Sequence, residues 1–259
     1  MLITSTKNEL VKGLRRLLQR SARRETGLHL IEGERLVFDA LETGVLPETL
    51  LIEQGRTDFE ARAAALGLDF VSVSRAVLEA VSDTSSPQGI AAAVRTPDSA
   101  PPKDIADFPR GLIAALDALQ DPGNLGTIIR TADAMGASAV LLGAGSTDAF
   151  SPKALRAAMG STYHLRIIEC ELSETLPALR ENGYSLVCGH LAGEERLPQL
   201  NADCVVVIGN EANGVSDGIA KLCSLCGLPM LGRAESLNAS AAASIMLFEI
   251  AKKIRGIKF

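Results

Sequence analysis

Uninterrupted apolar runs, separated by segments of helical periodicity, constrain the fold of this 259-residue chain more than any other feature. Cys204-Val-Val-Val-Ile208 is one of several such runs. A strand with apolar side chains on both faces is typical of a parallel sheet that helices cover on both sides. The alternation of these strands with helical segments after residue 110 therefore predicts an α/β fold built on a parallel sheet.

The second part of the chain holds enough such segments for one complete domain. We expect strands at 111–116, 138–142, 165–169, 184–188, 203–208 and 225–228, and helices at 124–135, 152–159, 172–182, 216–222 and 238–254. Ligands of open parallel sheets bind beyond the carboxyl ends of the strands. Three of these strand ends carry unusual polar or glycine-rich segments, so we expect the functional site there.

The first hundred residues repeat the alternation on a smaller scale. We expect helices at 7–21, 34–43, 58–66 and 75–81, and strands at 28–31, 49–52, 69–72 and 89–95. A polar, proline-rich join, Arg95-Thr-Pro-Asp-Ser-Ala-Pro-Pro-Lys103, follows them. The sequence therefore predicts a small α/β domain over residues 1–100 and a second domain over residues 108–259.

The charge distribution separates the amino-terminal segment from the rest. The formal net charge is −5, which argues against a protein that binds nucleic acid over its whole surface. Residues 1–35 nevertheless carry eight Lys and Arg against four Glu, a net charge of +4. Two interpretations fit this segment: an arm that contacts phosphates, and a solvated helix face. Tryptophan is absent and aromatic residues make up 3%, so stacking platforms for exposed bases are scarce.

Cysteine usage and hydropathy bear on the compartment. No early charged-then-apolar segment resembles a signal peptide, and no stretch is long and apolar enough to span a bilayer. We therefore expect a cytoplasmic protein with reduced thiols and no membrane contact. Cys223-x-x-Cys226 lacks the two further ligands that a structural zinc site requires, so no metal is expected.

The run from Asp117 to Gly136 gathers polar groups at a helix start. Asp121-Pro122-Gly123 is a turn signal, after which Asn124 is expected to cap the helix. Apolar residues recur at helical spacing on one face, and the opposite face carries Asn124, Thr127, Arg130 and Thr131. Such a face suits an anion or a ribose, and an ordinary capped helix with a solvated face shows the same pattern.

Two later strand ends carry comparable segments. Ile208-Gly-Asn-Glu-Ala-Asn-Gly-Val-Ser216 follows an apolar strand, and its glycines let the backbone approach a ligand closely. The segment from Leu228 to Ser240 leads into a helix rich in Ala and Ser, whose small side chains allow close packing. A glycine turn and ordinary helix packing are the structural alternatives. No G-x-G-x-x-G pattern occurs, which disfavours a nicotinamide site.

Taken together, three segments resemble the ordered motifs of the SpoU (TrmH) family, the RNA ribose 2′-O-methyltransferases of the SPOUT class. They are Asn124-Leu-Gly-Thr-Ile-Ile-Arg-Thr-Ala132, Ile208–Ser216 and Leu228–Ser240, and the resemblance extends over about residues 110–256. Leu30-Ile-Glu-Gly-Glu-Arg-Leu-Val37 and Val81-Ser-Asp-Thr-Ser-Ser-Pro-Gln-Gly-Ile90 are similar to the substrate-binding domain of that family.

The resemblance implies a parallel α/β sheet whose carboxyl-terminal segment threads through a loop to form a deep trefoil knot, a homodimer, and S-adenosylmethionine as cofactor. The cofactor contacts that it implies are Ile208, Gly209, Leu228, Met230 and Leu237. The catalytic residues that it implies are Asn124, Arg130, Glu211, Ser236 and Asn238. Arg130 would position a phosphate, Asn124 would hold the ribose or orient Arg130, and Glu211 would fix its loop or pair with Arg130.

The separate amino-terminal domain favours rRNA over tRNA as the structured RNA substrate. Three alternatives keep the same fold: a tRNA ribose methyltransferase, an enzyme that methylates rRNA to confer antibiotic resistance, and a catalytically silent RNA-binding or ribosome assembly factor. The complete set of implied catalytic residues disfavours the silent factor. The group that accepts the proton of the ribose hydroxyl is left open.

Overall fold

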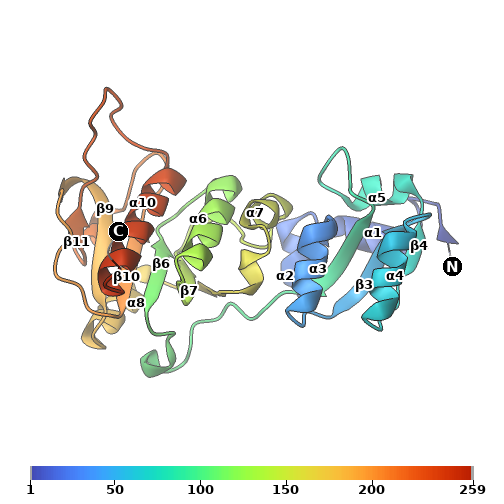
Figure 1. Ribbon diagram of the computed structural model, residues 1–259, viewed down its shortest axis with the longest axis horizontal. Coiled ribbons are helices and arrows are strands. Elements are labelled where there is room, and N and C mark those ends of the chain that lie inside the picture. Colours follow the sequence, from blue (N-terminus) through green and yellow to red (C-terminus); the bar gives the residue numbers. More distant parts are fainter. Residues whose placement is uncertain (1, 258–259) are drawn as a thin grey trace. The chain divides into compact units, whose positions relative to one another are not determined.

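The structure is a computed structural model that describes residues 2–257, and the chain divides into two compact units (Figure 1). The first unit combines Met1–Pro97 with Phe150–Tyr163, and the second combines Asp98–Ala149 with His164–Phe259. The sequence places Phe150–Tyr163 in the second domain, whereas this segment packs with the first unit. Its packing has a clear physical reason, because buried His29 lies against the Phe150 ring and bonds the Tyr163 hydroxyl at 2.7 Å.

The first unit is built on a mixed five-stranded sheet in the order β1-β4-β3-β5-β2. Strand β5 runs antiparallel to both of its neighbours, and the remaining pairs are parallel. The helices and strands of this unit are β1 (Leu2–Ile3), α1 (Glu9–Arg16), α2 (Arg20–Thr26), β2 (Leu28–Glu32), α3 (Glu34–Glu42), β3 (Pro47–Glu53), α4 (Thr57–Ala65), β4 (Val71–Val73), α5 (Arg75–Val81), β5 (Ile90–Arg95), α7 (Pro152–Ala158) and the 3₁₀ turn η2 (Ser161–Tyr163).

One expected helix, 7–21, is two helices in the structure, α1 and α2. The backbone leaves the helical region at Gln19, and the guanidinium of Arg23 donates to the carbonyl of Leu17 at 2.7 Å. Arg23 is buried, with 7% of its surface exposed. This cation therefore stabilises the break between the two helices, and the basic segment has fewer solvated charges than its composition indicates.

The second unit contains a six-stranded sheet in the order β11-β9-β10-β6-β7-β8, in which every pair is parallel. The predicted α/β fold with a parallel sheet is thus confirmed. The helices and strands of this unit are the 3₁₀ turn η1 (Ile105–Asp107), β6 (Leu112–Leu116), α6 (Pro122–Ala134), β7 (Ala139–Leu142), β8 (Arg166–Glu169), α8 (Leu172–Glu181), β9 (Ser185–Glu194), β10 (Cys204–Ile208), α9 (Asp217–Ala220), β11 (Ser224–Cys226) and α10 (Ala239–Ile254).

Both faces of this sheet are covered, as the apolar runs predict. All five residues of β10 are buried. Val205 and Val207 pack in a core cluster with apolar residues of α8 and α9, while α6 and α10 lie together over the other face (Figure 1). Continuous apolar strands are stable in this sheet because neither face meets water.

The strand order creates one place where a ligand site is expected. Strands β6 and β10 are neighbours, with Leu116 opposite Ile208, yet the chain leaves β6 toward β7 and arrives at β10 from β9 on the other side. Such a topological switch point opens a crevice at the carboxyl ends of the two strands. The first two sequence motifs begin at these two strand ends.

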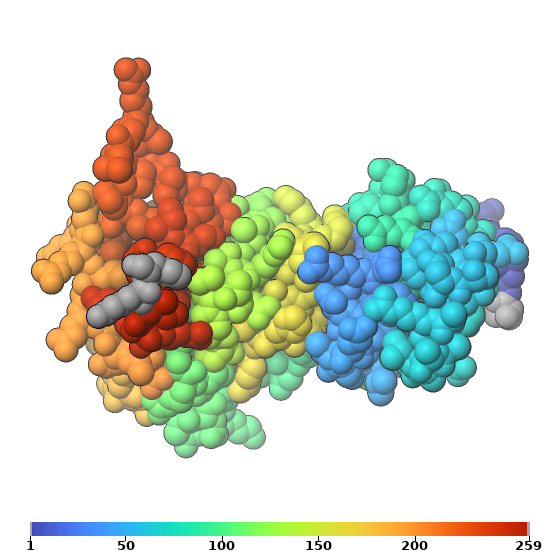
Figure 2. Space-filling view, viewed as in Figure 1, coloured from blue at the N-terminus to red at the C-terminus, as the bar shows by residue number. Residues whose placement is uncertain are grey.

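The connection from β11 to α10 stands out from the second unit as a narrow loop (Figure 2). Leu231 in this connection is 96% exposed. Within residues 2–257, no helix is both long enough and apolar enough to cross a membrane.

Candidate active site

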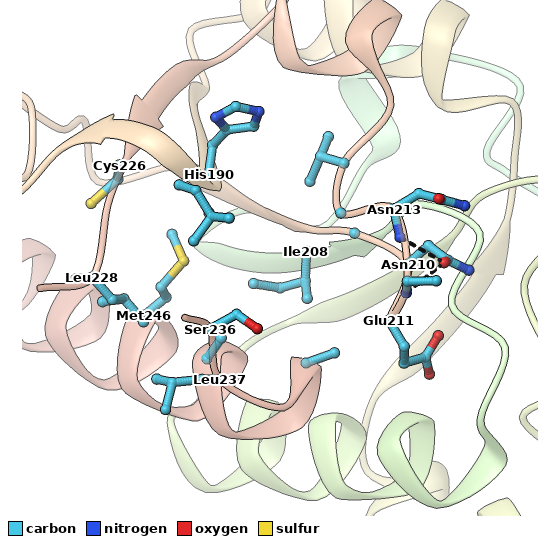
Figure 3. Close-up of a pocket in the computed structure, with 18 of the residues that line it drawn as sticks. His190, Ile208, Asn210, Glu211, Asn213, Cys226, Leu228, Ser236, Leu237 and Met246 are labelled. Atoms are coloured by element: carbon cyan, nitrogen blue, oxygen red, sulfur yellow. Dashed lines mark hydrogen bonds between the residues drawn. The ribbon is translucent and has the colours of Figure 1, made fainter. Parts of the chain in front are cut away.

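A pocket of about 310 Å³ lies beyond the carboxyl end of β10 and beside the middle of β9 (Figure 3). Its walls come from the middle of β9, from the loop after β10, and from the connection into α10. All five residues expected to contact the cofactor line it: Ile208, Gly209, Leu228, Met230 and Leu237. Glu211 and Ser236, two of the expected catalytic residues, line it as well.

The loop after β10 brings two backbone segments into direct contact. A Cβ atom at Gly209 would overlap the backbone of Gly214 and Val215. Asn210 and Gly214 exchange backbone hydrogen bonds of 2.9 Å in both directions. Only glycine fits at position 209, so the pocket wall there consists of backbone atoms.

A chain of side-chain hydrogen bonds joins the three sequence motifs. The amide of Asn124 donates to the Glu211 carboxylate at 3.0 Å, and the amide of Asn238 donates to Asn124 Oδ1 at 3.1 Å. Asn238 also caps α10, because its Oδ1 accepts from the backbone of Ser240 and Ala241. Three of the five expected catalytic residues therefore form one connected network.

Glu211 is an anchor of this network. Besides Asn124, its carboxylate accepts the backbone amides of Gln120 at 3.1 Å and Asp121 at 2.9 Å. Partial burial raises the pKa of Glu211, but these three hydrogen bonds outweigh the burial and hold the pKa below its ordinary value. The carboxylate stays ionised at neutral pH and ties the loop after β10 to the segment that precedes α6.

The helix cap differs from the sequence-based expectation. Asp121 caps α6, with its Oδ1 accepting the backbone amide of Asn124 at 2.8 Å. The prediction that Asn124 caps this helix is wrong, because the helix already begins at Pro122, directly after Asp121. The carboxamide of Asn124 is consequently available to link Glu211 with Asn238.

Arg130 and Ser236 lie outside the network. Arg130 is exposed on α6, and its side chain makes no hydrogen bond or ion pair within the described part of the chain. The ion pair that could have joined it to Glu211 is therefore absent there. Ser236 is exposed and lines the pocket close to Leu237 (Figure 3). Arg130 thus presents an unpaired guanidinium to whatever approaches α6.

The sequence analysis missed the residues that join the loop after β6 to the loop after β10. The Asn210 amide donates to the carbonyl of Ala118 at 2.8 Å, and its Oδ1 accepts the backbone amides of Ala212 and Asn213. Ala118 has φ 54°, an unfavourable left-handed conformation for alanine. Asp117 similarly accepts the amide of Ser216 at 2.8 Å. Asn210 is next to Glu211 in the second motif, so the sequence could have identified it as a site residue. The sequence could not have identified its partner, the carbonyl of Ala118.

Pocket residues from β9 and α10 were also missed. Gly189 and His190 line the pocket at the end of the apolar part of β9, and Met246 lines it from α10. A Cβ atom at Gly189 would lie 2.6 Å from the Met246 sulfur, so a larger residue there would displace the Met246 side chain. Gly189 and His190 directly follow the expected strand 184–188, and ligands bind beyond the carboxyl ends of such strands. This position in the sequence could have identified them.

Within residues 2–257, no group of three or more His, Cys, Asp or Glu side chains is arranged to hold a metal ion. Cys226 lines the pocket, and burial raises the pKa of its thiol, which therefore stays protonated at neutral pH and contributes an apolar surface.

Comparison with known proteins assigns this geometry to a family. Residues 111–248, which contain the network and every residue that lines the pocket, match the SpoU rRNA Methylase family. The chain belongs to the SpoU rRNA methylase family. Residues 8–92 match the MRM3-like substrate binding domain. The family resemblance inferred from the three motifs is confirmed.

Members of the SpoU family with similar sequences align along nearly the whole chain. A Bacillus subtilis protein named 23S rRNA (guanosine(2553)-2′-O)-methyltransferase RlmP is 36% identical over 253 residues, covering 96% of this chain and 98% of the relative. The human protein named rRNA methyltransferase 3, mitochondrial, is 30% identical over 297 residues, covering 92% of this chain and 70% of the relative.

Solved structures of the family share the fold. An AdoMet-bound rRNA methyltransferase from Sinorhizobium meliloti superposes with a TM-score of 0.86 at 34% identity, covering 100% of this chain and 99% of the other. The SpoU methyltransferase AviRb from Streptomyces viridochromogenes, in complex with AdoMet, gives a TM-score of 0.84 at 27% identity, covering 98% of this chain and 100% of the other.

Proposed function

We propose that this protein transfers a methyl group from S-adenosylmethionine to a ribose 2′-hydroxyl of rRNA. One observation carries the proposal. Hydrogen bonds between Asn124, Glu211 and Asn238 join the three sequence motifs into one network, and Glu211 of this network lines a pocket of cofactor size. The SpoU relatives named as rRNA methyltransferases, and their structures with AdoMet, support the same reaction for this chain.

The pocket residues fit S-adenosylmethionine. A volume of about 310 Å³ lies within the range of small-molecule sites. Ile208, Leu228 and Leu237 would provide an apolar slot for the adenine, and the bare backbone at Gly209 would allow main-chain groups to reach it. Met230 would complete this wall from the projecting connection.

When bound, the cofactor supplies a methyl group on a sulfonium that is already activated for displacement. The protein must therefore align the ribose oxygen with the methyl carbon and help to remove one proton. Asn124 is held by Glu211 on one side and Asn238 on the other, so its position is fixed before substrate arrives. This preorganised amide would hold the ribose, and Ser236 would complete the pocket.

Arg130 has the properties of a phosphate-binding residue. Its guanidinium is exposed and has no partner in the described chain, and its planar fork matches phosphate oxygens. Glu211 is a poor proton acceptor, because its oxygens accept three hydrogen bonds and its pKa lies below the ordinary value. We assign Glu211 to positioning and Arg130 to binding the nucleotide.

The proposal extends to the domains and to the topology. Residues 1–100 would bind the RNA substrate, and residues 108–259 would carry the methyltransferase site. The carboxyl-terminal segment would form the trefoil knot of the family. The carbonyl oxygen of Gly193 lies 2.7 Å from where a Cβ of Gly227 would lie, so the end of β9 is in direct contact with the start of the connection into α10.

A homodimer in the cytoplasm completes the proposal. Ile245 and Phe248 expose 43% and 38% of their surfaces on α10, and a second copy would cover them. All five cysteines are free thiols, which agrees with a reducing compartment.

Calorimetric titration tests the cofactor site. We expect S-adenosylmethionine to bind with one site per chain, and Arg130→Ala to retain that binding while losing methyl transfer. Absence of binding at millimolar cofactor would overturn the proposal. Loss of cofactor binding in Arg130→Ala would instead make Arg130 a structural residue.

A further inference from the structure

Two sequence motifs that the active site does not use meet in the first unit. The β2–α3 junction belongs to the motif Leu30–Val37, and the segment between α5 and β5 belongs to the motif Val81–Ile90. Together with α7 they enclose a pocket of about 230 Å³. Residues that line it and bear on its chemistry are Glu32, Arg35, Thr84, Ser86, Gln88 and Arg156.

The Gln88 side chain lines this pocket and is held in place by its amide oxygen. Gln88 Oε1 accepts the backbone amide of Glu34 at 3.0 Å, at the start of α3. Gly33 has φ +91°, and a Cβ atom there would lie 2.9 Å from Gln88 Oε1, so the contact requires glycine. The Gln88 NH₂ group finds no acceptor in the described part of the chain, which leaves two donors for a ligand.

The segment that carries Gln88 is fixed by arginines from the same unit. Arg75 donates to the carbonyl of Pro87 at 2.7 Å, and Arg56 donates to the carbonyl of Gln88 at 2.6 Å. These bonds satisfy the backbone of a surface segment whose side chains are mostly exposed. The segment is therefore preorganised although it adds little to the core, which is typical of a recognition loop.

Hydrogen-bond donors dominate the lining of this pocket. The carboxylate of Glu32 is already paired with Arg156 at 2.8 Å and accepts a hydrogen bond from the Ser82 hydroxyl. The Arg35 side chain is 69% exposed, and its ion pair with Asp39 is long, at 3.8 Å. Thr84 is not free, because its hydroxyl donates to Ser82 at 3.1 Å. Arg35, the Gln88 amide group and the hydroxyl of Ser86 thus remain to meet a ligand that is rich in acceptors.

We propose that this pocket binds one nucleotide of the substrate RNA through its phosphate and base-edge oxygens. The inference rests on the proposed function, which supplies an RNA as the partner. A volume of about 230 Å³ suits a single nucleotide, and arginine with carboxamide donors is the usual chemistry for phosphate and base oxygens. No aromatic side chain lines the pocket, so recognition there depends on hydrogen bonds rather than on stacking.

Filter binding of in vitro transcribed 23S rRNA to the full chain tests the inference. Gln88→Glu keeps the acceptor for the Glu34 amide but replaces the two donors by a carboxylate oxygen. Arg35→Glu reverses the exposed charge. The matched control is Arg95→Glu, at the far end of β5, roughly 17 Å along the strand from the pocket. S-adenosylmethionine affinity and melting temperature are measured for every variant.

We expect each pocket variant to weaken RNA binding about tenfold, while Arg95→Glu changes it less than about twofold and cofactor affinity stays constant. The inference is wrong if the wild type methylates the RNA and both pocket variants bind it as tightly as the wild type. If the wild type neither binds nor methylates the RNA, the proposed function itself fails. Should a variant unfold, photo-cross-linking of 4-thiouridine RNA to the wild type decides: cross-links to residues 84–88 support the pocket, and their absence overturns it.

Discussion

Substituting Asn210 by Asp tests how the two loops of the active site are held in register. Asn210 donates to the Ala118 carbonyl at 2.8 Å and accepts the amides of Ala212 and Asn213 at 2.9 and 3.2 Å. Aspartate has the same shape and keeps the acceptor. It replaces only the donor, so a carboxylate oxygen would face the carbonyl oxygen of Ala118.

The structure gives the size of the effect. Loss of the hydrogen bond costs about 1 kcal/mol, and leaving the partly buried carbonyl unpaired costs about 1–3 kcal/mol more. Ala118 would then be free to leave its left-handed conformation, which is itself unfavourable by about 1 kcal/mol. Displacement of Ala118 would move the backbone amides of Gln120 and Asp121, which donate to the Glu211 carboxylate. A total near 3 kcal/mol predicts that kcat/KM for methyl transfer falls about 100-fold.

A second substitution makes the argument specific. Ala118→Gly removes the backbone cost, so in the Asn210→Asp background we expect it to restore about fivefold in kcat/KM. The control is Asn213→Asp, which adds the same charge to the same loop but removes no side-chain hydrogen bond within the described residues. Cofactor affinity by calorimetry and methyl transfer under single-turnover conditions are the assays. If Asn210→Asp matches Asn213→Asp, or if Ala118→Gly restores nothing, the reasoning is refuted.

Three further predictions follow from the site and the charge distribution. Folding lowers the pKa of Glu211 below 4.5, so its carboxylate stabilises the fold at neutral pH. This stabilisation is lost as the pH falls through the pKa of the folded protein. Glu211→Gln should therefore lower the melting temperature near pH 7 but not in acid. A pH-independent difference would contradict this. Gly209→Ala should weaken S-adenosylmethionine binding more than about tenfold, because the new Cβ atom would overlap the backbone of Gly214. The control variant Gly218→Ala should bind the cofactor normally, because its Cβ atom would meet nothing within 4 Å. Equal affinities of the two variants would refute the role of the Gly209 contact. Arg15→Glu should weaken RNA binding and reduce its salt slope by about 1, and an unchanged slope would mean that Arg15 is merely solvated.

The α/β fold could be predicted because its signal is local. Uninterrupted apolar runs such as Cys204–Ile208 report strands buried on both faces, and the structure buries every residue of β10. The break between α1 and α2 could not be predicted, since it depends on the buried Arg23 reaching the carbonyl of Leu17. Likewise, the packing of Phe150–Tyr163 with the first unit depends on His29, more than a hundred residues earlier in the sequence.

The candidate site shows the same division. Its residue types follow from the three motifs, and strand order explains why two of them meet at the ends of β6 and β10. The partners within the site do not follow, because each is a contact between distant segments. Asn124 bonds Glu211 rather than capping α6, and Asn210 bonds Ala118. Sequence pattern identifies which side chains carry the chemistry, and tertiary packing decides which of them touch.

The most direct test of the account is to identify the methylated product. The protein is incubated with methyl-labelled S-adenosylmethionine and unmodified 23S rRNA or tRNA, the RNA is digested to nucleosides, and the labelled nucleoside is identified by mass spectrometry. We predict a 2′-O-methylated nucleoside from 23S rRNA that is absent when Arg130→Ala replaces the wild type. Label on a base, label in tRNA alone, or no label at all in the presence of bound cofactor would contradict the account.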